Sequence, residues 1–251
     1  MDVFYLTPLS PSPFHGEGVG GEVLSKMESK NKRITLILLL FLLVGWPLLS
    51  YVIMGESKSE MGFVGMDPIS QIYLPTIIIE WIIFLVVFLV LKRGKENLSA
   101  IGFSKFTIAN LGIGLAFLLF ANTILFGLAY ILHFFHLTMP KEVIFMLPRT
   151  KTEKIFWAIL SITAGICEET GFRGYVLTKL NLFLNNWYLT VGLSSLCFGL
   201  GHFYQGIGGI ILTGIYGLLF CLLFIWRKSL IPGIFAHFLQ DLTALFTLSR
   251  F

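Results

Sequence analysis

Three ionisable side chains stand close together in a strongly apolar part of the chain: Glu168, Glu169 and Arg173. The preceding residues 155–162 are almost wholly apolar, so these side chains are expected at membrane depth. An ionisable group at the centre of a bilayer costs about 2.5–3.5 kcal/mol on insertion scales. A chain that carries three of them within one short motif is therefore expected to use them for chemistry.

The two adjacent glutamates are expected to act differently if the motif is helical. Glu169 and Arg173 are four residues apart, share a helix face and can form an ion pair that makes a buried carboxylate tolerable. Glu168 points about 100° away from Glu169, so it is free to face an internal cavity and to act as a general base. A purely structural cluster of buried charges, or a helix end at the membrane interface, stays open as the alternative.

Two later apolar segments carry further polar side chains that could join the same site. His202 ends one of them, and His237 lies four residues before Asp241 in the other. This spacing puts His237 and Asp241 on one helix face, where Asp241 could orient the imidazole or both could point at one site. For His202, an interfacial or simply hydrogen-bonded histidine is the alternative.

Other polar residues of the apolar segments have a structural interpretation. Glu80 is a single acid in the second segment and is expected to make a helix–helix hydrogen bond. His133 and His136 end the third segment, where residues that seek the membrane interface are common. The three cysteines form no CxxC pair and are expected to pack as small apolar side chains. They are Cys167, Cys197 and Cys221.

The composition predicts the class of protein. Hydrophobic residues make up 56% of the 251 residues and charged residues only 13%, whereas a soluble domain carries about 25% charged residues. These values predict an all-α, polytopic transmembrane helix bundle. The net charge of +4 comes from basic residues at helix ends, and no basic run with interleaved aromatic residues points to nucleic acid as a partner.

Seven apolar runs are predicted to cross the membrane, which gives a bundle of about seven to eight spans. The predicted spans are residues 34–54, 72–91, 108–135, 155–177, 187–203, 208–226 and 230–248. The fifth run is short and the fourth contains the charged motif, so their boundaries are the hardest to set. Pro47 predicts a kink in the first span.

The chain divides into three parts. Residues 1–26 are rich in Pro, Ser and Gly without periodicity and are expected to be disordered. Because Met27 opens a basic stretch directly before the first apolar run, these residues are interpreted as a mis-called start. Residues 27–154 are expected to form the N-terminal transmembrane helices and loops, and residues 155–251 the catalytic transmembrane core.

Basic residues in short loops predict the orientation of the chain. They precede the first span, follow the second, and separate the sixth from the seventh. These residues are Lys30, Lys32, Arg33, Lys92, Arg93, Lys95, Lys105, Arg227 and Lys228. The N-terminus and these loops are therefore expected in the cytoplasm. The basic residues between Lys141 and Lys154 would then lie outside, unless that segment is a helix on the membrane surface.

The order of the polar motifs is more specific than any one of them. Glu-Glu-x-x-x-Arg at 168–173 is followed by Phe-x-x-x-His at 198–202 and by His-x-x-x-Asp at 237–241. This order, over about residues 155–248, resembles the CAAX-protease and bacteriocin-processing (CPBP) family of intramembrane endopeptidases, which includes type II CAAX prenyl endopeptidases. The resemblance implies hydrolysis of a peptide bond in a membrane-associated or prenylated (CAAX-type) protein or peptide.

The same resemblance implies a role for each motif position. Glu168 would activate the hydrolytic water with the help of His202. Glu169 and Arg173 would support them, and His237 would contribute to the oxyanion hole.

Asp241 and the cofactor are tied to the choice of mechanism. Asp241 falls where family members with a glutamic mechanism carry Asn, although Asp also occurs there, and it can donate in an oxyanion hole only when protonated. Zinc is the alternative cofactor, because four of the motif residues are plausible zinc ligands. These are Glu168, His202, His237 and Asp241. The metalloprotease signature His-Glu-x-x-His is absent, so a mechanism without metal is favoured.

Two other classes of protein stay open. A transporter with a polar core would carry its polar groups in both halves of an inverted repeat, whereas these motifs lie in the C-terminal half. A catalytically silent scaffold or bacteriocin self-immunity protein could use the same fold. The expected partners are membrane lipid and a membrane-associated or prenylated peptide. The expected location is the cell membrane, as a multi-pass protein of a bacterial inner or plasma membrane.

Overall fold

The computed structural model describes residues 24, 27–55, 67–138, 141–243 and 245. Within this part of the chain the regular structure is entirely helical, as predicted. The disorder expected for residues 1–26 lies outside the described residues, since the structure describes only Leu24 among them.

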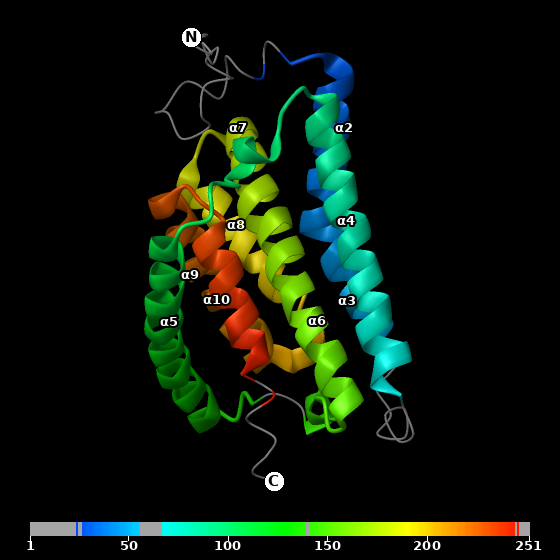
Figure 1. Ribbon diagram of the computed structural model, residues 1–251, viewed down its shortest axis with the longest axis vertical. Helices are drawn as coiled ribbons and strands as arrows, with labels where there is room; N and C mark the ends of the chain where they lie inside the picture. Colours follow the sequence, from blue (N-terminus) through cyan, green and yellow to red (C-terminus); the bar gives the residue numbers. More distant parts are fainter. Residues whose placement is uncertain (1–23, 25–26, 56–66, 139–140, 244, 246–251) are drawn as a thin grey trace, which may run out of the picture.

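The helices follow the predicted apolar runs closely (Figure 1). In their labels, η marks a 3₁₀ or π segment. The elements are α2 (Ser29–Leu40), η1 (Phe41–Gly45), α3 (Trp46–Gly55), η3 (Ile69–Tyr73), α4 (Leu74–Arg93), η4 (Leu98–Ile101), α5 (Ile108–Phe134), η5 (Lys141–Met146), α6 (Lys151–Glu168), η6 (Glu169–Val176), α7 (Leu177–Leu184), α8 (Trp187–Leu200), η7 (Phe203–Gln205), α9 (Gly206–Arg227) and α10 (Ile231–Leu242).

Five helices of the described part are long and apolar enough to cross a membrane. They are Ser29–Val52, Ile69–Arg93, Ile108–Phe134, Lys151–Leu184 and Phe203–Arg227. The polytopic helical architecture is supported, but the predicted count of seven to eight spans is not confirmed. The fifth and seventh predicted runs form α8, with 14 residues, and α10, with 12 residues. At 1.5 Å per residue these are about 21 Å and 18 Å long, short of the roughly 30 Å of hydrocarbon.

The first span adapts to Pro47 by a local change of helix type. Residues Phe41–Gly45 form a π-helical turn in which the Trp46 N–H donates to the Phe41 carbonyl. Pro47 follows directly, and it lacks the N–H group that a regular helical turn would use at that position. The irregularity predicted from Pro47 thus lies in the turn just before it.

Helix α10 is held between α6 and α5, with α4 packed on the other side of α6 (Figure 1). Glycines allow the close approach: a Cβ atom at Gly165 of α6 would lie 2.9 Å from the Ile234 carbonyl oxygen. One at Gly114 of α5 would lie 2.7 Å from the Pro232 carbonyl oxygen. Small residues at such contacts let helix backbones pack closely where apolar surface alone drives no association. The helix that carries His237 and Asp241 is therefore clamped from two sides.

The basic loops that were predicted to share one side of the membrane meet at one end of the bundle. The Leu230 N–H donates to the Gly102 carbonyl at 2.8 Å, and the hydroxyls of Ser104 and Ser229 lie 2.7 Å apart. The loop after α4 therefore contacts the loop between α9 and α10, and α2 begins at the same end in Figure 1. The segment considered as a membrane-surface helix contains the short 3₁₀ helix η5 at the opposite end. The compartment that each end faces stays a prediction.

Candidate active site

Glu168 and Glu169 lie near the midpoint of the 34-residue helix Lys151–Leu184, where α6 passes into η6. The eight residues of η6 are π-helical, which the sequence did not predict. Such segments are rare and occur often at functional sites, because the wider turn re-aims neighbouring side chains. The paired glutamates therefore stand deep in the bundle at a change of helix type.

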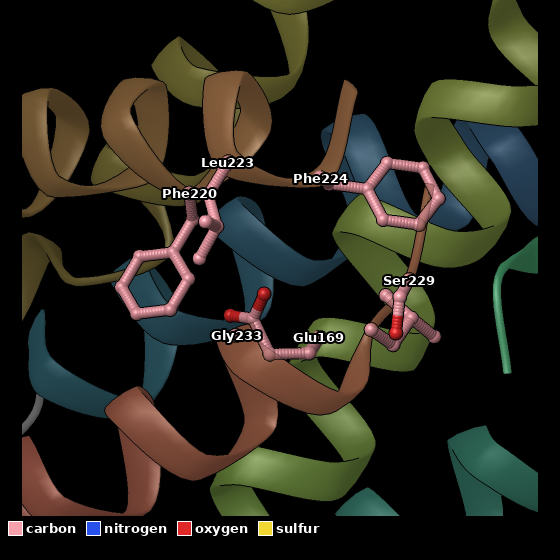
Figure 2. Close-up of a pocket in the computed structure, with 7 residues that line it drawn as sticks. Glu169, Phe220, Leu223, Phe224, Ser229 and Gly233 are labelled. Atoms are coloured by element: carbon pink, nitrogen blue, oxygen red, sulfur yellow. The ribbon is translucent and has the colours of Figure 1, made fainter. Parts of the chain in front are cut away.

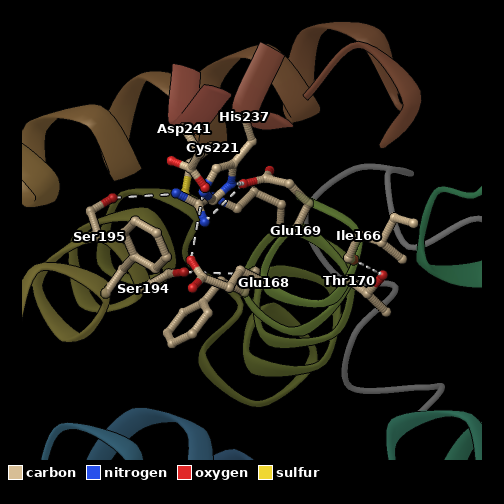
Figure 3. A network of polar contacts seen from close by, with 12 residues as sticks. Ile166, Glu168, Glu169, Thr170, Ser194, Ser195, Cys221, His237 and Asp241 are labelled. Carbon is tan, nitrogen blue, oxygen red and sulfur yellow. Dashed lines mark hydrogen bonds and ion pairs between the residues drawn. The ribbon is translucent and has the colours of Figure 1, made fainter. Parts of the chain in front are cut away.

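Glu169 is almost completely enclosed and has two partners. Its side chain is 1% exposed, and its Oε1 lies 3.1 Å from Arg173 Nη1. The same oxygen accepts a hydrogen bond from Nδ1 of His237 at 3.0 Å (Figure 3). The predicted pairing with Arg173 is present. The contact with His237 was not predicted, because the two residues are 68 positions apart and no local spacing signals their meeting.

Arg173 is held by one ion pair and two aromatic rings. Its guanidinium carbon lies 4.0 Å from the centre of the Phe198 ring and 5.1 Å from that of Phe220. The faces of aromatic rings attract a cation in a desolvated site. Within the described residues, its three nitrogens meet no acceptor in good hydrogen-bond geometry. The neutralisation of Arg173 therefore depends mainly on Glu169.

His237 also faces the two more open carboxyl groups. Its Nε2 lies 3.8 Å from Glu168 Oε2 and 3.7 Å from Asp241 Oδ2 (Figure 3). Both distances exceed that of a direct hydrogen bond, so a water or a substrate oxygen can bridge these groups. The side chains of Glu168 and Asp241 are 15% and 32% exposed, in contrast to that of Glu169. The accessible side of the cluster is therefore the side of Glu168 and Asp241.

His202 joins this cluster from the end of α8. Its Nδ1 lies 2.9 Å from the Phe198 carbonyl oxygen, which can only accept, so Nδ1 carries the hydrogen. In the neutral ring, Nε2 is then left as an acceptor. The centre of its ring lies 4.9 Å from that of Phe198, and the Phe198 ring centre lies 6.4 Å from that of His237. This geometry suits a residue that receives a proton.

The opposite side of Glu169 is closed. Figure 2 shows a crevice between α9, α10 and η6 with the Glu169 carboxylate at its edge. Its other walls are Phe220, Leu223, Phe224, Ser229, Leu230 and Gly233. The crevice is too narrow for a water molecule. This crevice therefore offers no room for an attacking water beside Glu169.

The residues considered as zinc ligands do not form a metal site in this arrangement. No group of three or more His, Cys, Asp or Glu side chains in the described part of the chain is arranged to hold a metal ion. Moreover, His237 already uses Nδ1 to contact Glu169. No catalytic step is therefore derived through a metal.

One acid outside the predicted set also lies against the site. Glu80 of α4 is 3% exposed, and its carboxyl group interacts electrostatically with that of Glu168. Glu80 Oε2 has no hydrogen-bond partner in the described part of the chain, so the helix–helix hydrogen bond expected of Glu80 stays a prediction. Only its isolation within an apolar run could have drawn attention to it in the sequence.

Comparison with known proteins places the six predicted site residues in one recognised segment. Residues 150–243 match the family model described as "Type II CAAX prenyl endopeptidase Rce1-like". This match confirms the resemblance inferred from the order of the motifs. No curated protein and no solved structure matches the chain.

Proposed function

Because residues 150–243 match the family model of type II CAAX prenyl endopeptidases, we propose that this multi-pass membrane protein is an intramembrane endopeptidase. It hydrolyses a peptide bond of a membrane-associated or prenylated (CAAX-type) protein or peptide. One observation carries the proposal. Glu168 and Asp241 flank the same nitrogen of His237 at 3.8 Å and 3.7 Å, in the interior of the bundle.

The first chemical step is the activation of water by Glu168. A water between Glu168 and His237 gives a proton to the carboxylate while its oxygen attacks the carbonyl carbon of the peptide bond. His202, with Nε2 free to accept, assists this transfer. Since Glu168 is partly accessible and Glu169 is not, the attacking water is assigned to Glu168.

The second requirement is stabilisation of the negative charge on the carbonyl oxygen. Both ring nitrogens of His237 face carboxyl oxygens, an arrangement that suits the imidazolium, which donates from both. Glu169 fixes the ring through Nδ1, so that Nε2–H can donate to the oxyanion. Protonated Asp241 is the second donor. The intermediate then collapses as the C–N bond breaks, and the amine takes the proton held by Glu168.

The surroundings of the site fit a substrate that arrives through the bilayer. Large apolar side chains are widely exposed on the outer helices, for example Phe126 at 74% and Tyr130 at 79%. Such surfaces are stable only against lipid. We propose membrane lipid and a membrane-associated or prenylated peptide as the partners, and a bacterial plasma membrane as the location.

The test is cleavage of a farnesylated peptide that ends in a C-a-a-X sequence, by the full chain purified in detergent. Glu168→Gln is expected to lower kcat by about 10²–10⁴-fold, the contribution of a general base, while the protein still inserts. Glu153→Gln is the matched control, because Glu153 only caps the start of α6. Wild-type turnover by Glu168→Gln would remove the proposal. A folded wild-type protein that releases no peptide would favour a silent scaffold.

A further inference from the structure

Helix α10 ends short of the lower ends of its neighbours α5 and α6 (Figure 1). The last four carbonyl groups of a helix have no partner within it, and those of α10 are expected within the bilayer, where water is scarce. Side chains supply donors for them. The Thr243 hydroxyl donates to the Gln240 carbonyl at 2.6 Å, and the Asp241 carbonyl accepts from Nε1–H of Trp157 at 2.9 Å. Since Trp157 lies on α6, the end of α10 is tied to α6 at Asp241.

The indole of Trp157 is itself held by two further segments. Its ring meets that of Tyr73, in η3, edge to face, with centres 5.6 Å apart and planes at 75°. This is a preferred arrangement of aromatic rings. Tyr73 is fully buried, and its hydroxyl donates to the carbonyl of Met146, in η5, at 2.8 Å. The N–H group of Trp157 is therefore presented to α10 in a fixed direction.

The hydrogen bond at the Asp241 backbone bears on the position of its side chain. Asp241 is next to the last residue of α10, and helix ends fray where their carbonyl groups lack partners. Its Oδ2 lies 3.7 Å from Nε2 of His237 (Figure 3). A loosened last turn would carry the carboxyl group away from this place, whereas the groups of a catalytic site act only when their supports hold them in position.

We propose that Trp157 is a positioning residue of the site, whose N–H group holds the last turn of α10 and so keeps the Asp241 carboxyl group beside His237. Trp157 takes no part in the proton transfers and acts through Asp241. The tie between the two helices stands on the geometry alone, whereas its effect on catalysis rests on the proposed function.

Hydrogen–deuterium exchange of the full chain in lipid nanodiscs tests the tie without substrate. Trp157→Phe keeps a ring against Tyr73 but lacks the N–H group, so the backbone amides of residues 240–243 should exchange roughly three- to tenfold faster, the effect of one lost hydrogen bond. A tryptophan analogue at position 157 in which sulfur replaces the N–H group keeps the shape of the indole. It should show the same increase, so a purely packing role is separated from donation.

Trp81→Phe is the matched control for both experiments. The Nε1–H group of Trp81 donates to Thr163 Oγ1 on α6 at 3.2 Å, and not to α10. Its loss should leave the exchange of residues 240–243 unchanged. Exchange at the wild-type rate in the protein with the sulfur analogue would overturn the proposal.

Cleavage of the farnesylated C-a-a-X peptide tests whether Trp157 acts through Asp241. Trp157→Phe should lower kcat roughly tenfold and leave KM nearly unchanged, because a group that stabilises the oxyanion acts in the transition state. In an Asp241→Ala background the same change should lower kcat by less than about twofold, since no carboxyl group remains to be positioned. Trp81→Phe should change kcat by the same factor in both backgrounds. An equal loss from Trp157→Phe with and without the Asp241 carboxyl group would contradict positioning.

The two experiments fail independently. If removal of the N–H group speeds exchange at the end of α10 but the wild-type protein cleaves no peptide, the proposed function is wrong and the tie stands. If the wild-type protein cleaves the peptide but the variants at position 157 change neither exchange nor kcat, the function stands and this inference is wrong.

Discussion

Glu168 and Glu169 are neighbours in the chain, yet their surroundings differ sharply. Glu169 is sealed between Arg173 and His237, whereas the Glu168 side chain is 15% exposed and faces His237 across a gap. The division of labour between the two acids could be predicted, because helical geometry turns adjacent residues apart and i, i+4 spacing pairs Glu169 with Arg173. The contact of Glu169 with His237 could not, because it depends on how α10 packs against α6.

The first prediction concerns the buried ion pair. Arg173→Ala leaves the buried charge of Glu169 with the His237 ring as its remaining partner among the described residues, which should cost roughly 3–5 kcal/mol. We expect poor accumulation in the membrane and a lower Tm of the purified protein, both measured against wild type.

A double variant is the control for this interpretation. Arg173→Met combined with Glu169→Gln removes both charges, and replacing a buried pair by neutral groups is far less harmful than breaking it. The double variant should therefore accumulate better than Arg173→Ala. A stable Arg173→Ala protein would show that the guanidinium is not needed to neutralise Glu169.

Asp241 separates the two mechanisms. If it is a protonated donor of the oxyanion hole, Asp241→Asn keeps a donor of nearly the same shape and should stay active. Asp241→Ala should then lose about 10²–10³-fold in kcat, the usual effect of one missing donor, and a chelator should have no effect. If it is an ionised zinc ligand, Asn should bind metal weakly and activity should respond to the chelator. An inactive Asn variant together with a chelator-sensitive wild type would favour zinc.

At the scale of helices, the apolar runs predicted where the helices lie better than they predicted departures from regular α-helical geometry. The third predicted span, 108–135, ends within one residue of α5, because a long apolar run between polar loops leaves little choice. The π-helical form of η6 was missed, since Glu-Thr-Gly-Phe-Arg-Gly has no local pattern that distinguishes π from α. The shortness of α8 agrees with the short fifth run, whereas the seventh predicted run, 230–248, is longer than the 12 residues of α10.

The contact between α6 and α10 can be tested at Gly165. A valine there would collide with the Ile234 carbonyl oxygen, 2.9 Å from the site of its Cβ. It would push α10 away and displace His237 from Glu169. Overpacking of this kind costs about 1–3 kcal/mol, so Gly165→Val should lower both Tm and kcat. Gly127→Val is the matched control, because a Cβ at that position in α5 meets nothing within 4 Å. Equal effects of the two valines would show that the close contact is not needed.

At the scale of the whole molecule, two short helices explain why polar groups can lie in the middle of an apolar bundle. Both α8 and α10 begin at the end where the basic loops meet (Figure 1). His202 follows the last residue of α8 closely, and Asp241 is next to the last residue of α10. As described, α8 and α10 are too short to cross the hydrocarbon layer, so His202 and Asp241 are expected to lie within the thickness of the bilayer. The proposed catalytic groups would thus be placed at depth by helix length as well as by sequence motif.

The order of the spans also predicts the orientation of the chain in the membrane. Two long spans separate Lys30 from Lys105, so these two residues are expected on one side of the membrane. Helix α5 then carries the chain to the opposite side before Lys151. Because basic loops stay inside, a membrane-impermeant maleimide should label Lys30→Cys and Lys105→Cys only in inverted vesicles and Lys151→Cys only in intact cells. All three positions are exposed, and Cys167 and Cys221 are buried, so a Cys197→Ser background keeps native labelling low. Labelling of Lys105→Cys and Lys151→Cys from the same side would contradict both the orientation and the passage of α5 through the bilayer.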